Sequence, residues 1–442
     1  MPQRLYRDFI VTDVFAGLNK YPYWWEAAPR PEETLPELPS EVDVLIVGGG
    51  FSGLCTARVL AQAGKSVLVC ESGFTGYGAS TRNGGMLGPS FHKLGIKGLT
   101  ARYGIERTHA ILKQSVGFVD FVKELTETED IDCDFHRSGR FRCASRRSHY
   151  EQMARDLETQ IETTGIEAEM IPAARVREEI GSDRFFGGVR YHIDGGLHPG
   201  KYHDGLLRVV RDAGAQFAPH SEVTRLKPNS HGFRVSTSRG DVTAGQVAIC
   251  TNGYTKDVTQ WFRRRLLPIR SAMIATEPLA PELMQRLMPT RRMYGDSRRI
   301  MAYYRPSPDG QRILFGGRAA GPGDRPEKNA QDLRKMMLDV FPELDQTRIT
   351  HSWSGLVAYT FDHVPHLGEH DGLFYAMGYC GSGVARSSFF GTKLGHKMLG
   401  NEEEGRTAFD DLEFETRPLY TGNPWFMPAL VRWHRLVDRL GF

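Results

Sequence analysis

Three glycines and one glutamate have the types and spacing of a dinucleotide-binding site. Gly48, Gly50 and Gly53 form a Gly-x-Gly-x-x-Gly pattern, and Glu71 stands 18 positions after the last of them. The first glycine permits a tight turn, the second lets a pyrophosphate approach the backbone, and the third allows a helix to pack closely on a strand. A carboxylate at the position of Glu71 can bind ribose hydroxyls and would repel the 2′-phosphate of NADP. The neighbouring candidates for cofactor contact are Phe51, Ser52 and Ser72.

The residues around this pattern predict the elements that would position it. Residues 42–47 form an apolar, β-branched run that suits a buried parallel strand, and a helical pattern follows the glycines as far as Gly64. A second short strand is expected at 67–69. The helix would direct free N–H groups and its positive dipole end at phosphates. This order of strand, turn, helix, strand and acid favours a Rossmann-like α/β fold over an isolated glycine turn.

A second glycine-rich segment, 76–87, reads GYGASTRNGGML and holds one cation, Arg82. Small residues let such a loop lie flat against a large planar ligand, with its N–H groups directed at ring oxygens. A plain surface loop is the alternative interpretation. The candidates for flavin contact here are Ala79, Ser80, Thr81, Arg82, Asn83, Gly84, Gly85 and Met86.

Further motifs follow in a fixed order: DGGLHPGKY, AICTNGY, YYRPSPDGQRILFGG and AMGYCGSGV. With the two glycine-rich segments, they resemble the FAD-dependent D-amino-acid oxidase superfamily, which includes sarcosine oxidase, glycine oxidase and D-amino-acid dehydrogenase. The resemblance extends from about residue 42 to 399, and it is greatest to the branch that oxidises γ-glutamylputrescine. It implies FAD as the cofactor and adds eight candidate contacts: Val223, Thr251, Asn252, Gly253, Gly378, Gly381, Gly383 and Val384.

Two departures from the superfamily pattern bear on the chemistry. Gly355 falls where monomeric sarcosine oxidases carry the cysteine that binds flavin, so we expect non-covalent FAD. Leu314 falls where the same enzymes place a lysine that promotes the reaction with oxygen. The resemblance therefore leaves oxygen and another electron acceptor, such as a quinone or carrier, both open.

Antiparallel strands within 263–354 are expected to form a substrate domain over the flavin. In the sarcosine oxidase branch, the positions of Tyr304 and Arg318 face the substrate, and Arg318 has the geometry to bind a carboxylate. Trp353 is a third candidate, as an aromatic wall that lowers the local dielectric and disfavours a protonated amine. Each has a structural alternative, namely packing for the two aromatic residues and an ion pair for Arg318.

These candidates predict an FAD-dependent oxidoreductase that transfers hydride from the C–N bond of a small amine to flavin N5. The imine would then hydrolyse to an aldehyde. The substrate would be a γ-glutamylated amine, a secondary amine or an amino acid. Two alternatives remain: an FAD-dependent 2-hydroxy acid dehydrogenase on the same frame, and a non-catalytic flavin subunit of a larger complex.

Bulk properties are consistent with an enzyme of two domains. The chain has 442 residues and a formal net charge of only +3, which argues against a nucleic-acid partner. Its six cysteines form no Cys-x-x-Cys pair, so no metal site is expected. We expect a cytoplasmic protein without membrane contact, and the sequence leaves its oligomeric state open.

We predict a discontinuous FAD domain from 41–95, 166–262 and 355–400, and a second, α+β substrate domain from 96–165 and 263–354. Residues 1–40 would form an N-terminal extension, in which the aromatic stretch YPYWW (21–25) either pins the tail to the surface or caps the substrate entrance. Residues 401–442 would form a C-terminal extension with an amphipathic helix.

Overall fold

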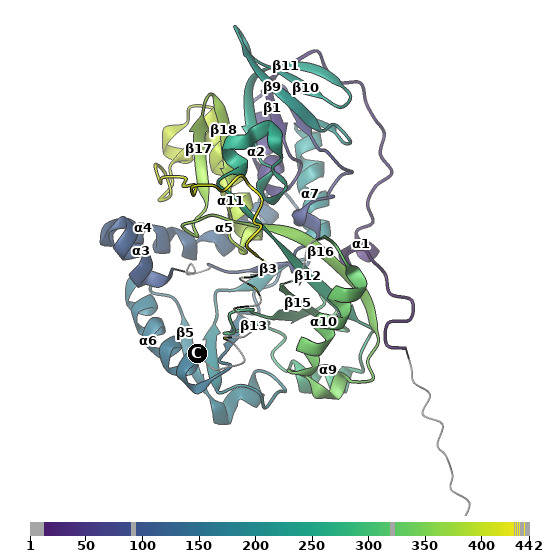
Figure 1. The fold of residues 1–442 in the computed structure, drawn as a ribbon, viewed down its shortest axis with the longest axis vertical. Coiled ribbons are helices and arrows are strands. Elements are labelled where there is room, and N and C mark those ends of the chain that lie inside the picture. Colours follow the sequence, from purple (N-terminus) through teal and green to yellow (C-terminus); the bar gives the residue numbers. More distant parts are fainter. Residues whose placement is uncertain are drawn as a thin grey trace, which may run out of the picture.

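The computed structural model describes residues 13–89, 94–318, 323–427, 429, 431, 433 and 437. They form two eight-stranded sheets, which occupy the upper and lower halves of the view in Figure 1, and one two-stranded pairing. The fold is thus mixed α/β, with one sheet largely parallel at its centre and the other largely antiparallel. The predicted helix around 430–440 lies mostly outside the described residues.

The first sheet contains the predicted strand–turn–helix–strand unit. Strand β1 pairs in parallel with both β2 and β11, and β11 pairs in parallel with β18. Strands β9 and β10 form an antiparallel hairpin beside β11. In path order the sheet comprises β17 (His366–His370), β18 (Leu373–Met377), β11 (Gly240–Ile249), β1 (Glu41–Val47), β2 (Val67–Cys70) and β8 (Gln216–Ala218), with β9 (Val223–Asn229) and β10 (Gly232–Thr237) off this path.

Helices cover this sheet and share one apolar core with it. Helix α2 (Phe51–Gln62) follows the glycine turn and packs against α11 (Gly383–Met398) and α7 (Pro199–Asp212). Almost all residues of α2 are buried, which explains why its sequence is apolar on most sides. Helices α3 (Gly95–Tyr103), α4 (Ile105–Val116) and α5 (Phe118–Thr128) pack on the same core.

The second sheet is antiparallel apart from one parallel pair, β4 with β13. Its order is β16 (Ile349–Tyr359), β12 (Leu267–Thr276), β15 (Ile313–Arg318), β14 (Tyr303–Pro306), β13 (Met293–Asp296), β4 (Arg140–Cys143), β6 (Gly187–Tyr191) and β5 (Ala168–Pro172). The helices beside it are α6 (Arg147–Thr164), α9 (Pro281–Leu287) and α10 (Pro326–Leu338). Three short helices complete the described elements, α1 (Trp24–Ala27), α8 (Gln260–Arg263) and α12 (Glu402–Gly405), with the strand pair β3 (Met86–Leu87) and β7 (Gly195–Gly196).

Alternation along the strands gives the second sheet two distinct apolar faces. Tyr304 and Phe315 belong to the core beneath α10, whereas Leu314 and Trp353 belong to a smaller cluster on the opposite face. Trp24 of α1 inserts into that smaller cluster. Helix α1 therefore lies at the junction of the two sheets (Figure 1).

The sheet pairings amend the proposed division into domains. Strands β5 and β6 were assigned to the FAD domain but pair within the second sheet, because β6 bonds to β4. Helices α3 to α5 were assigned to the substrate domain but pack on the core of the first sheet. Among the described residues, no helix has the length and apolar character needed to cross a bilayer.

Candidate active site

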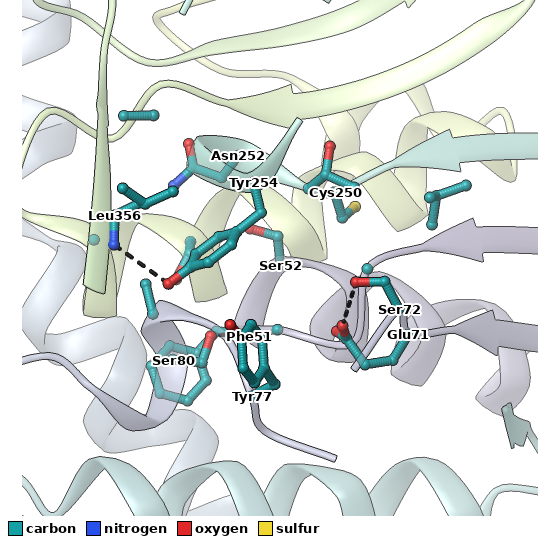
Figure 2. A pocket seen from close by; sticks show the side chains of 18 of the residues that line it. Phe51, Ser52, Glu71, Ser72, Tyr77, Ser80, Cys250, Asn252, Tyr254 and Leu356 are labelled. Atoms are coloured by element: carbon teal, nitrogen blue, oxygen red, sulfur yellow. Dashed lines mark hydrogen bonds between the residues drawn. The ribbon is translucent and has the colours of Figure 1, made fainter. Parts of the chain in front are cut away.

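A large cavity opens where the parallel strands of the first sheet end. Its space, including the open mouth, is about 1320 Å³. Walls come from the glycine turn, the end of β2, the loop 77–83, the start of β9, the turn after β11, the end of β16 and the start of α11. Figure 2 shows Phe51 and Ser52 on one side of this cavity and Leu356 and Asn252 on another.

Each glycine of the fingerprint occupies a position that excludes a side chain. A Cβ on Gly48, whose φ is +108°, would lie 2.9 Å from the carbonyl oxygen of Cys250. A Cβ on Gly50 would lie 2.8 Å from Ser80 Oγ, and one on Gly53 only 2.0 Å from the Gly48 oxygen. Gly48 and Gly50 line the cavity, while Gly53 brings α2 against the turn. These are the roles that the spacing predicts for the three residues.

The Glu71 carboxylate is fixed at the edge of the cavity. Its Oε2 accepts a hydrogen bond of 3.0 Å from the Gly49 amide, and its Oε1 accepts one of 3.1 Å from the Gly73 amide. The Ser72 hydroxyl donates to Oε1 at 3.3 Å, a contact visible in Figure 2. The acid is therefore held in one position at the end of β2, where the ribose of a dinucleotide would need it.

Most of the predicted cofactor residues line this single cavity, although they come from distant parts of the chain. They are Gly48, Gly50, Phe51, Ser52, Glu71, Ser72, Ala79, Ser80, Asn83, Val223, Thr251, Asn252, Gly381, Gly383 and Val384. The remaining predicted residues do not line it: Gly53, Thr81, Arg82, Gly84, Gly85, Met86, Gly253, Gly355 and Gly378. Several of the latter support lining residues. For example, the Gly378 amide donates to Asn252 Oδ1 at 2.9 Å.

Sequence analysis missed several lining residues that flank the predicted ones. Tyr254 follows directly on the predicted 251–253 segment, and its hydroxyl accepts a hydrogen bond of 3.3 Å from the Leu356 amide (Figure 2). Its ring lies edge-on to Tyr77, with 6.3 Å between the ring centres. Burial raises the pKa of the Tyr254 hydroxyl, so this wall stays uncharged. Position next to a predicted motif was the available signal for Tyr254.

Three thiols also line the cavity: Cys70, Cys250 and Cys380. Burial raises the pKa of Cys70 and of Cys250 to about 12, and it raises the pKa of Cys380 as well. The thiolate is the nucleophilic form of cysteine, and it is disfavoured at all three positions. Cys70 precedes Glu71, and Cys250 and Cys380 lie in the motifs AICTNGY and AMGYCGSGV, so position beside predicted residues was the available signal here too.

An ion pair stands at another part of the cavity wall. Lys256 Nζ lies 2.8 Å from Glu222 Oε1, and both residues line the space beside Val223. These two side chains are 61% and 40% exposed, so solvent weakens the attraction between them. The pair had no signal in the sequence, because its members stand in unrelated motifs.

The structure corrects the prediction for Tyr304. This residue is fully buried, stacked between Tyr294 and Phe315 on the face of the second sheet that α10 covers. Its neighbour Tyr303 is on the other face, where its hydroxyl lies 2.9 Å from Ser271 Oγ. A one-residue shift along a strand reverses the face. Tyr304 therefore packs in the core, and Tyr303 is the tyrosine on the side of the glycine-rich segment 76–87, near Gly84.

Trp353 also does not line the cavity. It is 1% exposed, and its indole donates a hydrogen bond of 2.8 Å to the carbonyl oxygen of Arg82. It therefore supports the glycine-rich loop from behind. The Arg82 guanidinium lies over the rings of Trp25 and Tyr77, at 5.0 and 5.1 Å from their centres.

Arg318 is half-buried at the end of β15, on the same face of the strand as Leu314. Its guanidinium carbon lies 5.6 Å from the centre of the Tyr359 ring. The Tyr359 hydroxyl in turn lies 3.1 Å from where a Cβ on Gly381 would stand. Tyr359 thus lies between Arg318 and Gly381, and of these three residues only Gly381 lines the cavity.

Within the described residues there is no group of three or more His, Cys, Asp or Glu side chains placed to hold a metal ion. The arrangement instead offers backbone amides, one fixed carboxylate and a large, mostly apolar hollow. Such a site suits a dinucleotide whose distal part carries a planar ring system.

Comparison with known proteins gives a consistent result. Residues 43–395 match the family model described as FAD dependent oxidoreductase. The chain is 30% identical to a probable oxidoreductase OrdL of Haemophilus influenzae, over 82% of this chain and 84% of that protein. It is 29% identical to the gamma-glutamylputrescine oxidoreductase of Escherichia coli, over 96% and 97% of the two chains. The crystal structure of glycine oxidase from Geobacillus kaustophilus shares the fold, with a TM-score of 0.71 at 23% identity over 86% of this chain and 99% of that one.

Proposed function

Because this chain belongs to the family of FAD-dependent oxidoreductases, we propose that it oxidises the C–N bond of a small amine that carries a carboxylate, with FAD bound non-covalently. As a member of that family, the chain is an oxidoreductase that acts on amine or amino-acid donors. The finer proposal rests on one observation: the Arg318 guanidinium lies over the Tyr359 ring, and the Tyr359 hydroxyl approaches Gly381, which lines the cavity. The similarity to gamma-glutamylputrescine oxidoreductase over nearly the whole chain supports a γ-glutamylated amine as the substrate class.

The residues present fit FAD. The fingerprint glycines leave no room for side chains, so a pyrophosphate can approach the backbone at Gly48 and Gly50. The fixed Glu71 carboxylate would hold the ribose, and the N-terminus of α11 at Gly383 would face the flavin end with a positive dipole. Gly355 provides no nucleophile, and burial keeps the lining thiols protonated, which supports non-covalent binding.

When bound, FAD would supply the acceptor for one hydride, which carries the two electrons of the oxidation. The protein's contribution is orientation and exclusion of water. Arg318 would bind the substrate carboxylate with its two-pronged guanidinium and so place the C–N bond over the cofactor. The half-buried ring of Tyr254 in the cavity wall, and that of Tyr359 beside Gly381, would lower the local dielectric and favour the neutral amine with a free lone pair. The buried Leu314, in place of a lysine, supplies no cation for a reaction with oxygen.

Anaerobic mixing of the purified yellow protein with a panel of amines and 2-hydroxy acids tests this proposal. We expect the flavin absorption near 450 nm to bleach with carboxylate-bearing amines. Bleaching with hydroxy acids alone would assign the protein to that other reaction. A yellow protein that no compound reduces would indicate a flavin subunit that needs a partner. Flavin that stays with the protein pellet after acid precipitation would contradict non-covalent binding.

A further inference from the structure

Three tryptophan side chains hold three consecutive residues of the glycine-rich loop. The indole of Trp25 donates to Thr81 Oγ1 at 3.1 Å, that of Trp353 to the Arg82 carbonyl, and that of Trp24 to the Asn83 carbonyl, the last two at 2.8 Å. None of these three indoles lines the cavity, whereas the loop residues Ala79, Ser80 and Asn83 do. The hydrogen bonds that hold the loop therefore come from residues outside the cavity wall.

Trp24 is the most enclosed of the three and comes from the N-terminal extension. It is 0% exposed and packs with Met273, Leu314 and Trp353 on the face of the second sheet opposite α10. Its ring meets His198 edge-on, with 5.0 Å between ring centres. The indole thus fills the space between the second sheet, the start of α7 and the glycine-rich loop.

Arg305 donates hydrogen bonds to the next two residues of the same loop. Its Nη1 donates to the carbonyl oxygens of Gly84 and Gly85, at 3.4 and 2.8 Å, and to that of Leu197 at 2.9 Å. Within the described part of the chain it has no carboxylate in ion-pair contact, and burial lowers its pKa to about 10. Its guanidinium carbon lies 5.8 Å from the centre of the Trp24 ring. Each residue from Thr81 to Gly85 thus accepts a hydrogen bond from one of these four side chains. Within the loop, the Gly85 amide also donates to Asn83 Oδ1.

We propose that the aromatic segment 21–25 is part of the cofactor site, with Trp24 as a positioning residue that fixes the glycine-rich loop against FAD. This inference rests on the proposed function, in which FAD binds non-covalently in the cavity. A buried carbonyl without a donor carries a desolvation cost, so removal of one indole N–H favours loop conformations that turn the carbonyl away. Those conformations displace Ser80 and Asn83 from the cavity wall.

The experiment compares Trp24→Phe with Trp425→Phe, a matched change of a tryptophan that is 75% exposed near the C-terminus. Titration of each apoprotein with FAD, followed by flavin fluorescence, gives the dissociation constant. The loss of one hydrogen bond predicts that Trp24→Phe binds FAD roughly 2- to 12-fold more weakly than the wild type. The control should bind FAD with unchanged affinity. At saturating FAD, the visible circular dichroism of the bound flavin should also change, which a merely less stable scaffold would not produce.

Equal affinities and identical visible dichroism for the two variants would overturn the inference. If Trp24→Phe does not fold, Trp25→Phe decides instead, because Trp25 is only half-buried and bonds to the side chain of the same loop. An affinity for Trp25→Phe equal to that of the control would then overturn it. A wild-type protein that binds no FAD would overturn the proposed function itself, so the two failures are distinguishable.

Discussion

At the scale of single residues, Arg318 is the side chain on which substrate recognition depends in our proposal. Arg318→Ala should raise KM for a carboxylate-bearing amine about 10- to 150-fold, since a charge-assisted hydrogen bond contributes roughly 1.5–3 kcal/mol. Arg318→Lys should fall between, because lysine keeps the charge but lacks the planar fork. The FAD content of both variants should equal that of the wild type, and an uncharged amine should show no change in KM. Loss of FAD from Arg318→Ala would place the residue at the cofactor instead.

Glu71 is the residue on which the adenosine half of the cofactor should depend. Its carboxylate accepts from the amides of Gly49 and Gly73, so Glu71→Gln removes the charge and replaces one acceptor oxygen by a donor group. We expect FAD affinity to fall about 10- to 150-fold, measured by fluorescence titration of the apoprotein. Glu369→Gln, at an exposed position on β17 of the same sheet, is the matched control and should bind FAD normally. An unchanged affinity in Glu71→Gln would remove this carboxylate from the site.

The sequence predicted Gly48, Gly50 and Glu71, which the fold brings to one cavity, because their spacing is local. It failed for Tyr304, because the face on which a strand residue points depends on register, and a one-residue difference reverses it. It also missed the pair of Glu222 and Lys256, whose partners are 34 positions apart and belong to no common motif. Contacts of this kind come from tertiary packing, which a single sequence does not display.

At the scale of elements, the start of α7 depends on an unprotonated histidine. His198 is the N-cap residue, and its Nδ1 accepts a hydrogen bond of 3.1 Å from the Lys201 amide. Burial lowers the pKa of His198 to about 4, from 6.5 in an exposed histidine. The unfolded chain therefore binds the proton first as pH falls. The stability that His198 provides is complete above pH 6.5 and is lost as pH falls towards 4.

This difference in pKa predicts a measurable loss of stability in mild acid. Between pH 7.5 and 5, the wild type should lose about 2 kcal/mol of unfolding free energy through His198 alone. His198→Asn keeps a side-chain oxygen for the cap but cannot titrate, so it should lose that much less over the same range. Urea unfolding of both proteins at the two pH values provides the comparison. Parallel losses in the two proteins would show that His198 does not titrate as its environment implies.

The helices and strands themselves were mostly readable from periodicity. The run 42–47 predicted β1 (Glu41–Val47), and the antiparallel strands expected within 263–354 include β12, β14 and β15. The sequence did not predict which sheet or core each of these elements joins. Strand β6 joins the second sheet by pairing with β4 across more than 40 residues of chain, β5 joins it through β6, and α3 to α5 cover the other core. Short elements are compatible with several partners, and only long-range packing selects among them.

At the scale of the whole molecule, the cavity joins segments from residue 47 to residue 387. FAD bound there would contact strand ends, turns and a helix that are distant in the chain. Trp24 adds the N-terminal extension to this assembly through the loop 81–85. Bound FAD should therefore stabilise the folded state of the whole chain, in addition to its role in the reaction.

This stabilisation predicts a melting temperature that depends on the concentration of free FAD. A ligand that binds only the folded state adds RT ln(1 + [L]/Kd), which is about 2.7 kcal/mol at 100 times Kd. For a chain of 442 residues, this increment should raise the melting temperature by a few degrees relative to the apoprotein. The rise should continue with the logarithm of FAD concentration, and Glu71→Gln should need correspondingly more FAD for the same rise. A melting temperature that is independent of added FAD, in a protein that stays yellow after acid precipitation and washing, would instead indicate a covalent bond to the flavin. In that case one of the cavity cysteines, despite its raised pKa, would be the first attachment site to examine.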